Sequence, residues 1–470
     1  MKSAISARYV FVACMALLYP SCDNGALPPE NVSDAPHIVA HAVQQNPNNA
    51  LSAIVQVMSR NATGVRLEAR DDSGRVHYSP LTPVRRASVL LPLLGLDQNR
   101  TYTCRVLAFS NGRGEAQSAP FQFVTDARPG NIPRLSVLVN NGATEGYVLL
   151  VGPSGNDPNR HYAYIVDNSG KVVWYRPFGS SMLDFQKQPD GTYTAFSSLD
   201  TSAGRFFQMD NLGNILREYR ALGAPETGPH ELLLRNDGYL IFGVEYRVMN
   251  LTGIGGQPNA VVRGLTVEYN RYSGASFIWN SFDHFNVADA LPDVPITGSN
   301  VNPWHGNAID VDTDGHLLVS WRSLGEITKI NSATGQIIWR LGGRNNQFTF
   351  LNDPLNGFSH QHGIRRLPNG NIILFDNGNL HSPPASRAIE YRLDENARVA
   401  ELVWEYRPNP PISSPILGFA QRLANGNTLV CFGRAQRIIE VDRTGAVVWD
   451  VRIDSPGIYA YRALRIGSLY

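Results

Sequence analysis

The segment from Ser359 to Asn379, SHQHGIRRLPNGNIILFDNGN, contains one copy of a pattern that recurs along the second part of the chain. His362 stands eight residues before Gly370, and the apolar run IILF after that glycine is typical of a buried strand. The pattern returns with His230 eight residues before Gly238, His305 ten before Gly315, Leu183 eight before Gly191 and Gly418 eight before Gly426. A repeat with histidine in only three copies predicts a scaffold on which a site has been built.

A β-hairpin pattern also recurs six times from Pro133 onward, and it predicts the architecture of this scaffold. The copies are YIVDNSGKVVW, FQMDNLGNILR, VEYNRYSGASFIW, TKINSATGQIIW, YRLDENARVAELVW and IEVDRTGAVVW. Five turns close at glycine (Gly170, Gly213, Gly274, Gly335 and Gly445), with Ala397 in the fifth copy. Five second strands end in tryptophan (Trp174, Trp279, Trp339, Trp404 and Trp449), with Arg217 in the second copy.

The spacing of these hairpins favours a β-propeller. The turns follow one another at intervals of 43, 61, 61, 62 and 48 residues, and a four-stranded blade needs about 40 to 50 residues. A solenoid is the alternative, but no helical periodicity accompanies the strands. We therefore expect an all-β protein with a six-bladed β-propeller over residues 133–470, closed by pairing of the segment 462–467 with the first blade.

The residues before the repeats predict an export signal and a second domain. Lys2 and Arg8 precede an apolar run at 9–19 that is too short to span a membrane, which is typical of a secretory signal at 1–22. Cys22 resembles a bacterial lipoprotein attachment site, so a lipid anchor is one alternative and simple cleavage the other. After a polar linker at 23–35, short alternating runs over 36–127 predict a small β-sandwich.

Composition restricts the class of protein further. The net charge of +1 gives no electrostatic reason to expect nucleic acid as a partner. Four cysteines are present, of which Cys104 and Cys431 fall in different predicted domains, so no disulfide framework is implied. We expect an exported protein of the periplasm or cell envelope; its oligomeric state is left open.

The three in-register histidines are the candidate site. In a propeller the innermost strand of each blade lines the central channel, so His230, His305 and His362 should converge near its axis. Asn307 would share a face with His305, and Arg322 ends the next strand. Histidine, arginine and asparagine without neighbouring carboxylates suit the transfer of an anionic group such as sulfuryl or phosphoryl.

These motifs resemble a known family, the bacterial arylsulfate sulfotransferases. The resemblance covers most of residues 133–470 and is carried by PHELLLRNDGYLIF, WHGNAIDVDTDGHLLVSWR and QHGIRRLPNGNIILFDNGN. Such enzymes are six-bladed periplasmic propellers that move a sulfuryl group between phenols without a nucleotide donor. The resemblance therefore implies an aryl sulfate donor, a phenolic acceptor and no cofactor. Separately, the segment 93–118 resembles the later strands of fibronectin type III domains, with Tyr102 placed against the preceding loop.

The family resemblance also implies roles for the site residues. His362 would be the nucleophile that forms a sulfohistidine, while His230, His305, Asn307 and Arg322 would bind and polarise the sulfuryl group or the phenolic oxygen. Protonated His230 or His305 would donate to the departing phenolate. Trp304 and Trp321 could form aromatic walls, with core packing as the alternative for at least one of them.

Two other functions remain open from the residues alone. Propellers and fibronectin-like domains often serve as recognition surfaces, so a non-catalytic binding or adhesion protein is possible on this pattern. Three histidines are also a common zinc shell, although the positive charge of Arg322 disfavours a nearby dication.

Overall fold

The computed structural model describes residues 35–470 except 111–113, 152–160, 180–181, 199–203 and 456. The predicted signal, Cys22 and the linker up to residue 34 lie outside the described residues. Within the described part of the chain, no helix is long and apolar enough to cross a membrane.

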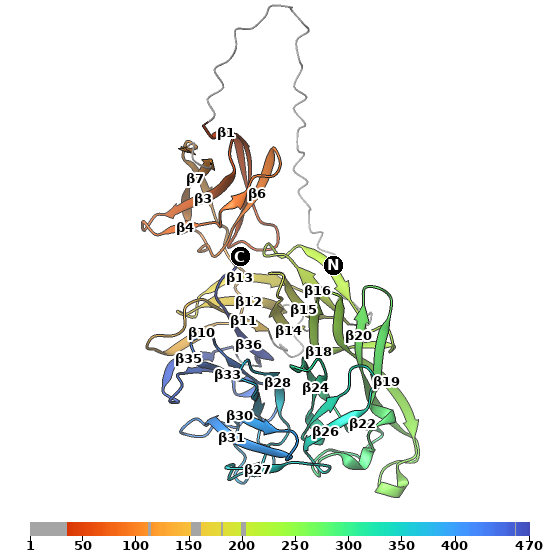
Figure 1. Cartoon of the computed structure of the whole chain (residues 1–470). Coiled ribbons are helices and arrows are strands. Elements are labelled where there is room, and N and C mark those ends of the chain that lie inside the picture. The colour runs from red at the N-terminus through yellow and green to blue at the C-terminus, as the bar shows by residue number, and fades with distance from the viewer. Residues whose placement is uncertain (1–34, 111–113, 152–160, 180–181, 199–203, 456) are drawn as a thin grey trace, which may run out of the picture.

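The first domain is a sandwich of two antiparallel sheets (Figure 1). One sheet contains β1 (His37–Gln45), β2 (Ala53–Arg60) and β6 (Ser88–Leu93). The other contains β3 (Gly64–Asp71), β4 (Val76–Tyr78), β5 (Thr82–Pro83), β7 (Thr101–Ser110), β8 (Gly114–Gln117) and β9 (Phe121–Val124). Tyr102 is fully buried, and its hydroxyl accepts a hydrogen bond of 2.7 Å from the backbone N–H of Asp97 in the preceding loop. Kinship with fibronectin type III domains stays a prediction.

Six sheets form the second domain, one for each predicted blade, and all their strand pairs are antiparallel except those made by the short strands β22 (Asn300–Val301) and β27 (Thr349–Leu351). Blade 1 contains β36 (Arg462–Ile466), β11 (Tyr147–Val151), β12 (Tyr162–Asp167) and β13 (Val172–Pro177); blade 2 contains β14 (Met182–Lys187), β15 (Tyr193–Ser197), β16 (Arg205–Met209) and β17 (Ile215–Tyr219). Blade 3 contains β18 (Glu226–Arg235), β19 (Gly238–Met249), β20 (Ala260–Arg271) and β21 (Ser276–Asn280), with β22 (Asn300–Val301) paired to β20.

The other three blades follow the same order from the channel outward. Blade 4 contains β23 (Gly306–Val311), β24 (Leu317–Trp321), β25 (Glu326–Ile330) and β26 (Ile337–Gly342). Blade 5 contains β28 (His362–Arg366), β29 (Ile372–Asp376), β30 (Arg387–Asp394), β31 (Val399–Tyr406) and β27 (Thr349–Leu351). Blade 6 contains β32 (Phe419–Arg422), β33 (Thr428–Phe432), β34 (Arg437–Val441), β35 (Val447–Ile453) and β10 (Leu135–Asn140). Short 3-10 turns lie at η2 (Thr252–Ile254), η3 (Ser281–Asp283), η4 (Val287–Asp289), η5 (Arg322–Leu324) and η6 (Gly433–Ala435).

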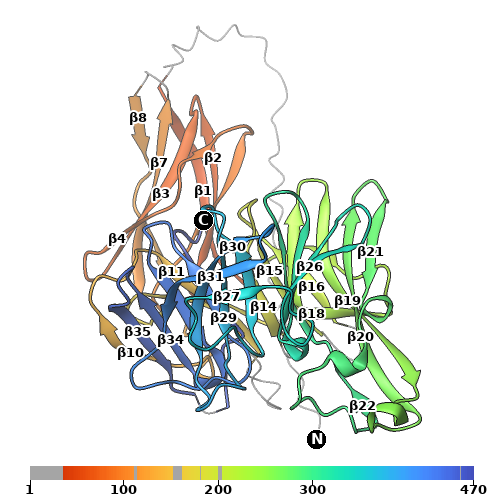
Figure 2. The same cartoon turned by 60° about the horizontal axis from the view of Figure 1, so that its bottom comes forward.

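The first strands of the blades line the channel, because β36, β14, β18, β23, β28 and β32 contact one another in that order and the last contacts the first. The ring closes twice. The carboxy-terminal strand β36 pairs with β11 of blade 1, which confirms the predicted closure, and β10 pairs with β35 of blade 6. The six-bladed propeller is therefore confirmed, and Figure 2 shows the sheets arranged around the ring.

Three of the repeated tryptophans share a structural reason. Indole Nε1–H groups reach from the outer strand of one blade to the outer turn of the next: Trp174 to Asn211 O, Trp279 to Gly335 O and Trp449 to Asn168 O, at 2.9 to 3.0 Å. In blade 2, Arg217 replaces the indole and stacks over the ring of Tyr272 in the turn of blade 3, 4.7 Å from its centre. The residue that ends the hairpin pattern in the sequence thus makes a contact between blades, in addition to marking the end of a strand.

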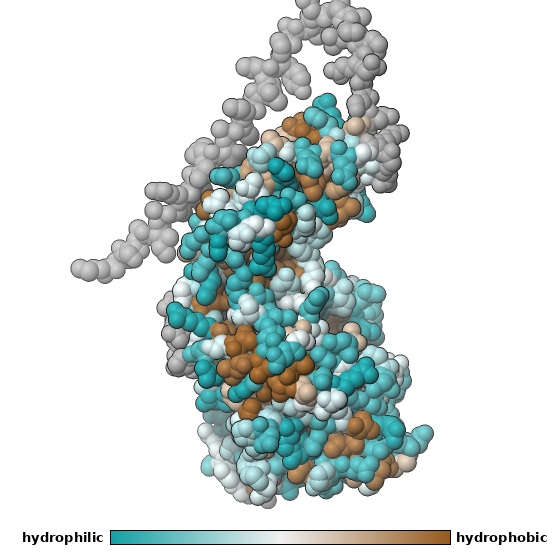
Figure 3. Space-filling model, turned by 90° about the vertical axis from the view of Figure 1, so that its left-hand side faces the viewer, coloured by the Kyte–Doolittle hydropathy of each residue, from teal (hydrophilic) through white to brown (hydrophobic). Residues whose placement is uncertain are grey.

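The sandwich docks on the end of the propeller that carries these outer turns. Figure 3 shows it as a separate lobe at one end of the molecule. Asn46 Nδ2 donates to Leu212 O at 2.9 Å, and Leu94 N donates to the Tyr470 hydroxyl at 3.0 Å. The direction of the innermost strands shows which residues lie at the end of the channel opposite the sandwich. The innermost strands run from His305 and His362 toward the sandwich end, so these histidines lie at the opposite end of the channel.

Candidate functional site

The three predicted histidines occupy the innermost strands of blades 3, 4 and 5. His230 lies within β18, His305 directly precedes β23, and His362 opens β28. The rings of His230 and His305 meet edge to face with centres 5.0 Å apart, and the charge of His362 acts on the pKa of both. The repeat register thus brings the three imidazoles together, as the sequence predicted.

His362 has a defined tautomer because of Asn377. The Nδ2 group of Asn377 donates to Ser414 O at 2.6 Å and to Leu417 O at 2.8 Å, which turns its Oδ1 toward His362 Nδ1 at 2.7 Å. The carbonyl of His360 also faces Nδ1, at 3.1 Å. With two oxygens at this position, Nδ1 carries the proton and Nε2 keeps its lone pair. His362 is therefore set as a base or nucleophile through Nε2.

All three imidazoles are neutral in the resting protein. Burial and the charge of Arg322 lower the pKa of His362 to about 3. Burial and neighbouring positive charges hold the pKa of His230 and of His305 well below the usual value. The expectation of a protonated donor is therefore wrong for the resting site, and each neutral ring can offer only an N–H group. In His305 that group is Nε2–H, because Asn302 Nδ2 donates to Nδ1 at 2.9 Å.

The lowered pKa of His362 makes stability depend on pH. Its folded pKa of about 3 lies below the ordinary 6.5, so the unfolded chain binds the extra proton between these values and stability is lost as the pH falls. Within that range, each such histidine should remove about 1.4 kcal/mol of unfolding free energy for every pH unit by which the pH falls. Urea unfolding between about pH 7 and pH 4 should show a slope shallower by this amount in His362→Gln. An unchanged slope would contradict a neutral, buried His362.

Arg322 provides an unpaired positive charge beside the histidines. Its Nη2 donates to Pro415 O at 3.1 Å, its Nε is buried without a hydrogen-bond partner, and no carboxylate among the described residues forms an ion pair with it. Burial lowers its pKa from the ordinary value, and its charge acts on His230, His305 and His362. A desolvated guanidinium with free donors is suited to bind an oxyanion.

Asn307 is fully buried and connects the strand that follows His305 to the residue before His362. Its Nδ2 donates to Gln361 O, directly before His362, at 2.7 Å, while its Oδ1 has no partner. The amide therefore supports the backbone directly before His362 and keeps a second N–H; contact with a sulfuryl oxygen stays a prediction.

Strained backbone marks the same place. His305 and His360 adopt φ of 43° and 56°, a left-handed region in which non-glycine residues are uncommon. His360 is 2% exposed, and its Nε2 lies 3.2 Å from Asp293 Oδ2. Such strain persists only where surrounding contacts enforce it, as at a functional site.

The sequence missed three features of this site. Asn377 directly follows β29, as Arg322 directly follows β24, so the repeat frame itself carried a signal for it. The proline-rich segment around 408–415 supplies carbonyls to Asn377 and Arg322. Arg263 on β20 has a charge that acts on His230 and His305, and nothing in the repeat pattern marked it.

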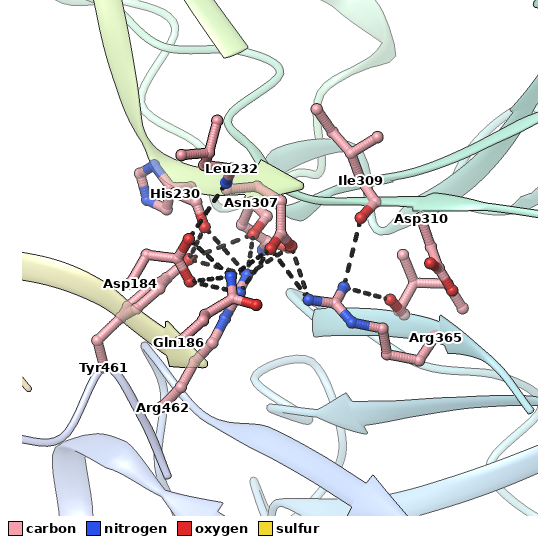
Figure 4. Close-up of polar contacts among 12 residues, drawn as sticks. Asp184, Gln186, His230, Leu232, Asn307, Ile309, Asp310, Arg365, Tyr461 and Arg462 are labelled. Atoms are coloured by element: carbon pink, nitrogen blue, oxygen red, sulfur yellow. Dashed lines mark hydrogen bonds and ion pairs between the residues drawn. The ribbon is translucent and has the colours of Figure 1, made fainter. Parts of the chain in front are cut away.

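Two expectations need correction. Carboxylates do lie next to the histidine strands, because Asp184 of β14 and Glu231 of β18 are fully buried in the channel with Arg462 and Arg365 (Figure 4). Trp304 and Trp321 are 1% and 0% exposed within one hydrophobic core, so neither forms a substrate wall. The repeat pattern showed which residues approach the channel axis. It did not show which side chains of the other strands are buried by packing against the neighbouring blade.

The zinc alternative gains no support from the donor geometry. Among the residues that the structure describes, no three histidine, cysteine, aspartate or glutamate side chains are grouped so that they could hold a metal ion. The predicted lack of a disulfide is consistent with Cys104 and Cys431, which are both buried as free thiols.

Comparison with known proteins identifies one family. The family described as Arylsulfotransferase (ASST) matches residues 134–445. No curated protein matches the chain. Similar solved structures include a protein of unknown function from Bacteroides caccae, with 14% identity, TM-score 0.43, and coverage of 69% of this chain and 100% of that one. A streptogramin B lyase has 12% identity, TM-score 0.38, and coverage of 69% and 89%. At these scores the likenesses carry no argument about function.

Proposed function

Because the chain belongs to the arylsulfotransferase (ASST) family, and is accordingly a sulfotransferase, we propose that it moves a sulfuryl group from an aryl sulfate to a phenol through a sulfohistidine at His362. The observation that carries this proposal is the environment of His362. Asn377 holds the proton on Nδ1, burial keeps the ring neutral, and Nε2 is left with its lone pair beside an unpaired Arg322.

The proposed reaction has two balanced halves. In the first, the Nε2 lone pair bonds to sulfur, and the bond from sulfur to the aryl oxygen breaks with its electrons leaving on oxygen. The phenolate departs and takes a proton from water. In the second, an acceptor phenol that has lost its proton to water attacks sulfur, and the nitrogen–sulfur bond breaks to restore neutral His362. The proton on Nδ1 stays in place throughout, shared with Asn377 Oδ1.

The other site residues complement charge rather than exchange protons. Arg322 would bind the sulfuryl oxygens, whose negative charge it offsets in a desolvated setting. The N–H groups of neutral His230 and His305 would donate to the aryl oxygen as it gains charge. Arg263 acts electrostatically on these two rings.

Intact-mass spectrometry tests the proposal. After brief incubation with a chromogenic aryl sulfate at mildly alkaline pH, without acceptor, the folded protein should gain about 80 Da at His362, and a phenol should remove it. Released phenol with the added mass on another residue would reject His362 as the nucleophile. If folded protein gave neither adduct nor released phenol, a non-catalytic binding protein would be the better description.

A further inference from the structure

One cluster at the channel axis receives a residue from the innermost strand of every blade. We call it the hub; its members are Arg462 (β36), Asp184 (β14), Glu231 (β18), Asn307 (β23), Arg365 (β28) and Phe419 (β32). Asp184, Glu231 and Arg462 are each at most 2% exposed. The hub lies directly against the strands that carry the site histidines, and the function proposed above does not use its charged side chains.

Arg462 is the centre of the hub and holds two site strands from across the channel. Its Nη2 donates to the backbone carbonyls of His230 and of Asn307, both at 3.0 Å. These carbonyls belong to β18 and β23, whereas Arg462 opens β36, the strand that closes the ring. Figure 4 shows the guanidinium of Arg462 between these strands, next to the backbone of His230.

The neighbouring residue repeats the same contacts. The hydroxyl of Tyr461 lies 3.0 Å from His230 O and 3.2 Å from Asn307 O. The ring of Tyr461 packs edge to face against that of His230, with centres 5.7 Å apart. Tyr461 and Arg462 therefore both approach the same pair of carbonyls, although the single hydroxyl proton of Tyr461 serves one carbonyl at a time, and Tyr461 also supports a site imidazole.

The carboxylates of the hub keep Arg462 charged and fixed. Its Nη1 lies 2.6 Å from Asp184 Oδ1 and 2.9 Å from Glu231 Oε1. Burial alone would lower the pKa of Arg462, but Asp184 and Glu231 raise it well above its ordinary value. Gln186 donates to Asp184 and to Glu231, and Arg365 adds two bonds to Glu231. The guanidinium of Arg462 is therefore fixed by two carboxylates, one of which also binds Arg365.

We propose that Arg462 is a positioning residue for sulfuryl transfer: by joining the ring-closing strand to the carbonyls of His230 and Asn307, it sets the distance between the site strands of blades 3 and 4. The proposal rests on the function proposed for the site. A displacement of about 1 Å can cost about 100-fold in rate without removing any group that touches the substrate. Closure of the propeller would then be part of building the site as well as of stabilising the fold.

Arg465 offers a matched control on the same strand. It is buried in an ion pair of 2.8 Å with Glu440 and donates to Thr144 O and Asn168 Oδ1, away from the histidines. We expect Arg462→Met to lower kcat about 100-fold with a much smaller change in KM. Arg465→Met should lose a similar amount of thermal stability but keep kcat within about twofold. Equal losses of kcat in the two folded variants, or no loss in Arg462→Met, would overturn the proposal.

Hydrogen exchange separates this proposal from the sulfotransferase function. Amides of β18 and β23 should exchange faster in Arg462→Met than in Arg465→Met, even if the wild-type protein transferred no sulfuryl group. Should Arg462→Met fail to fold, Arg462→Lys and Tyr461→Phe test the proposal instead. The ammonium of Arg462→Lys cannot bond both carbonyls and both carboxylates together, and Tyr461→Phe lacks the hydroxyl that lies near the same carbonyls. If both variants had the kcat of the wild-type protein and its rates of amide exchange, the proposal would be overturned. A several-fold loss of kcat together with faster amide exchange in β18 and β23 would support it.

Discussion

Replacing His362 by alanine is expected to reduce sulfuryl transfer from an aryl sulfate by about 10⁴-fold or more, because the substitution removes the atom that forms the covalent bond. His362 is 3% exposed and sits at the start of a strand, so the loss should appear in kcat and in the first half-reaction alike. The measurement is release of a chromogenic phenol in a single turnover. Neither a phenol burst nor the added mass on the protein should be seen.

His316 provides the control for this variant. It lies in the turn between β23 and β24, at the end of the propeller away from the site, where Nδ1 accepts a hydrogen bond from Ser332 N. His316→Ala should retain the burst. A folded His362→Ala protein that still transfers sulfuryl groups at a rate near wild type would show that His362 is not the nucleophile, and it would leave the family assignment untouched.

Replacing Arg322 by methionine is expected to lower kcat by about 100- to 1000-fold, the cost of losing a preorganised donor aimed at developing charge. Its Nε has no partner and its charge is not paired among the described residues, so the guanidinium is free to bind sulfuryl oxygens. Arg322→Lys should recover only part of this loss, since an ammonium keeps the charge but lacks the planar pair of donors. Steady-state and single-turnover rates with one aryl sulfate measure both effects.

The pKa of the histidines gives this prediction a second readout. Arg322 is one of the charges that lower the pKa of His362, so Arg322→Met should move that pKa upward toward its ordinary value. Arg271→Met is the control, because Arg271 pairs with Asp237 at the sandwich end of blade 3. If Arg322→Met and Arg271→Met had equal kcat and an equal pH dependence, Arg322 would have no part in the site.

Much of the fold followed from local pattern. Strand and turn residues recur at blade spacing. In four blades the indole or guanidinium at the end of the outer strand contacts the next blade, so there one repeat carries both the strands and their packing. The in-register histidines followed from the same periodicity. Asn377 occupies the position after the second strand that Arg322 occupies one blade earlier, which means that the repeat contained more of the site than the histidines alone suggest.

Contacts between distant segments could not be predicted in the same way. The carbonyls of Ser414 and Leu417 that orient Asn377 come from an irregular loop, and no periodicity fixes where a loop places its backbone. The protonation of His230 and His305 likewise depends on burial and on the charges of Arg263 and Arg322, which come from different blades; for His230 the charge of Arg462 also contributes. A sequence pattern identifies residue type and spacing, whereas desolvation is a property of the assembled channel.

By itself, then, the sequence determined the all-β class, the six repeats, the closing strand and the convergence of His230, His305 and His362 on one channel, since each of these depends on spacing along the chain. Only the tertiary structure decided which nitrogen of His362 is free, that the imidazoles are neutral, and that Arg462 joins the ring-closing strand to the site. The physical reason is that hydrogen bonds and charges act over a few ångströms in space, and closing the ring brings residues about 230 positions apart within that range.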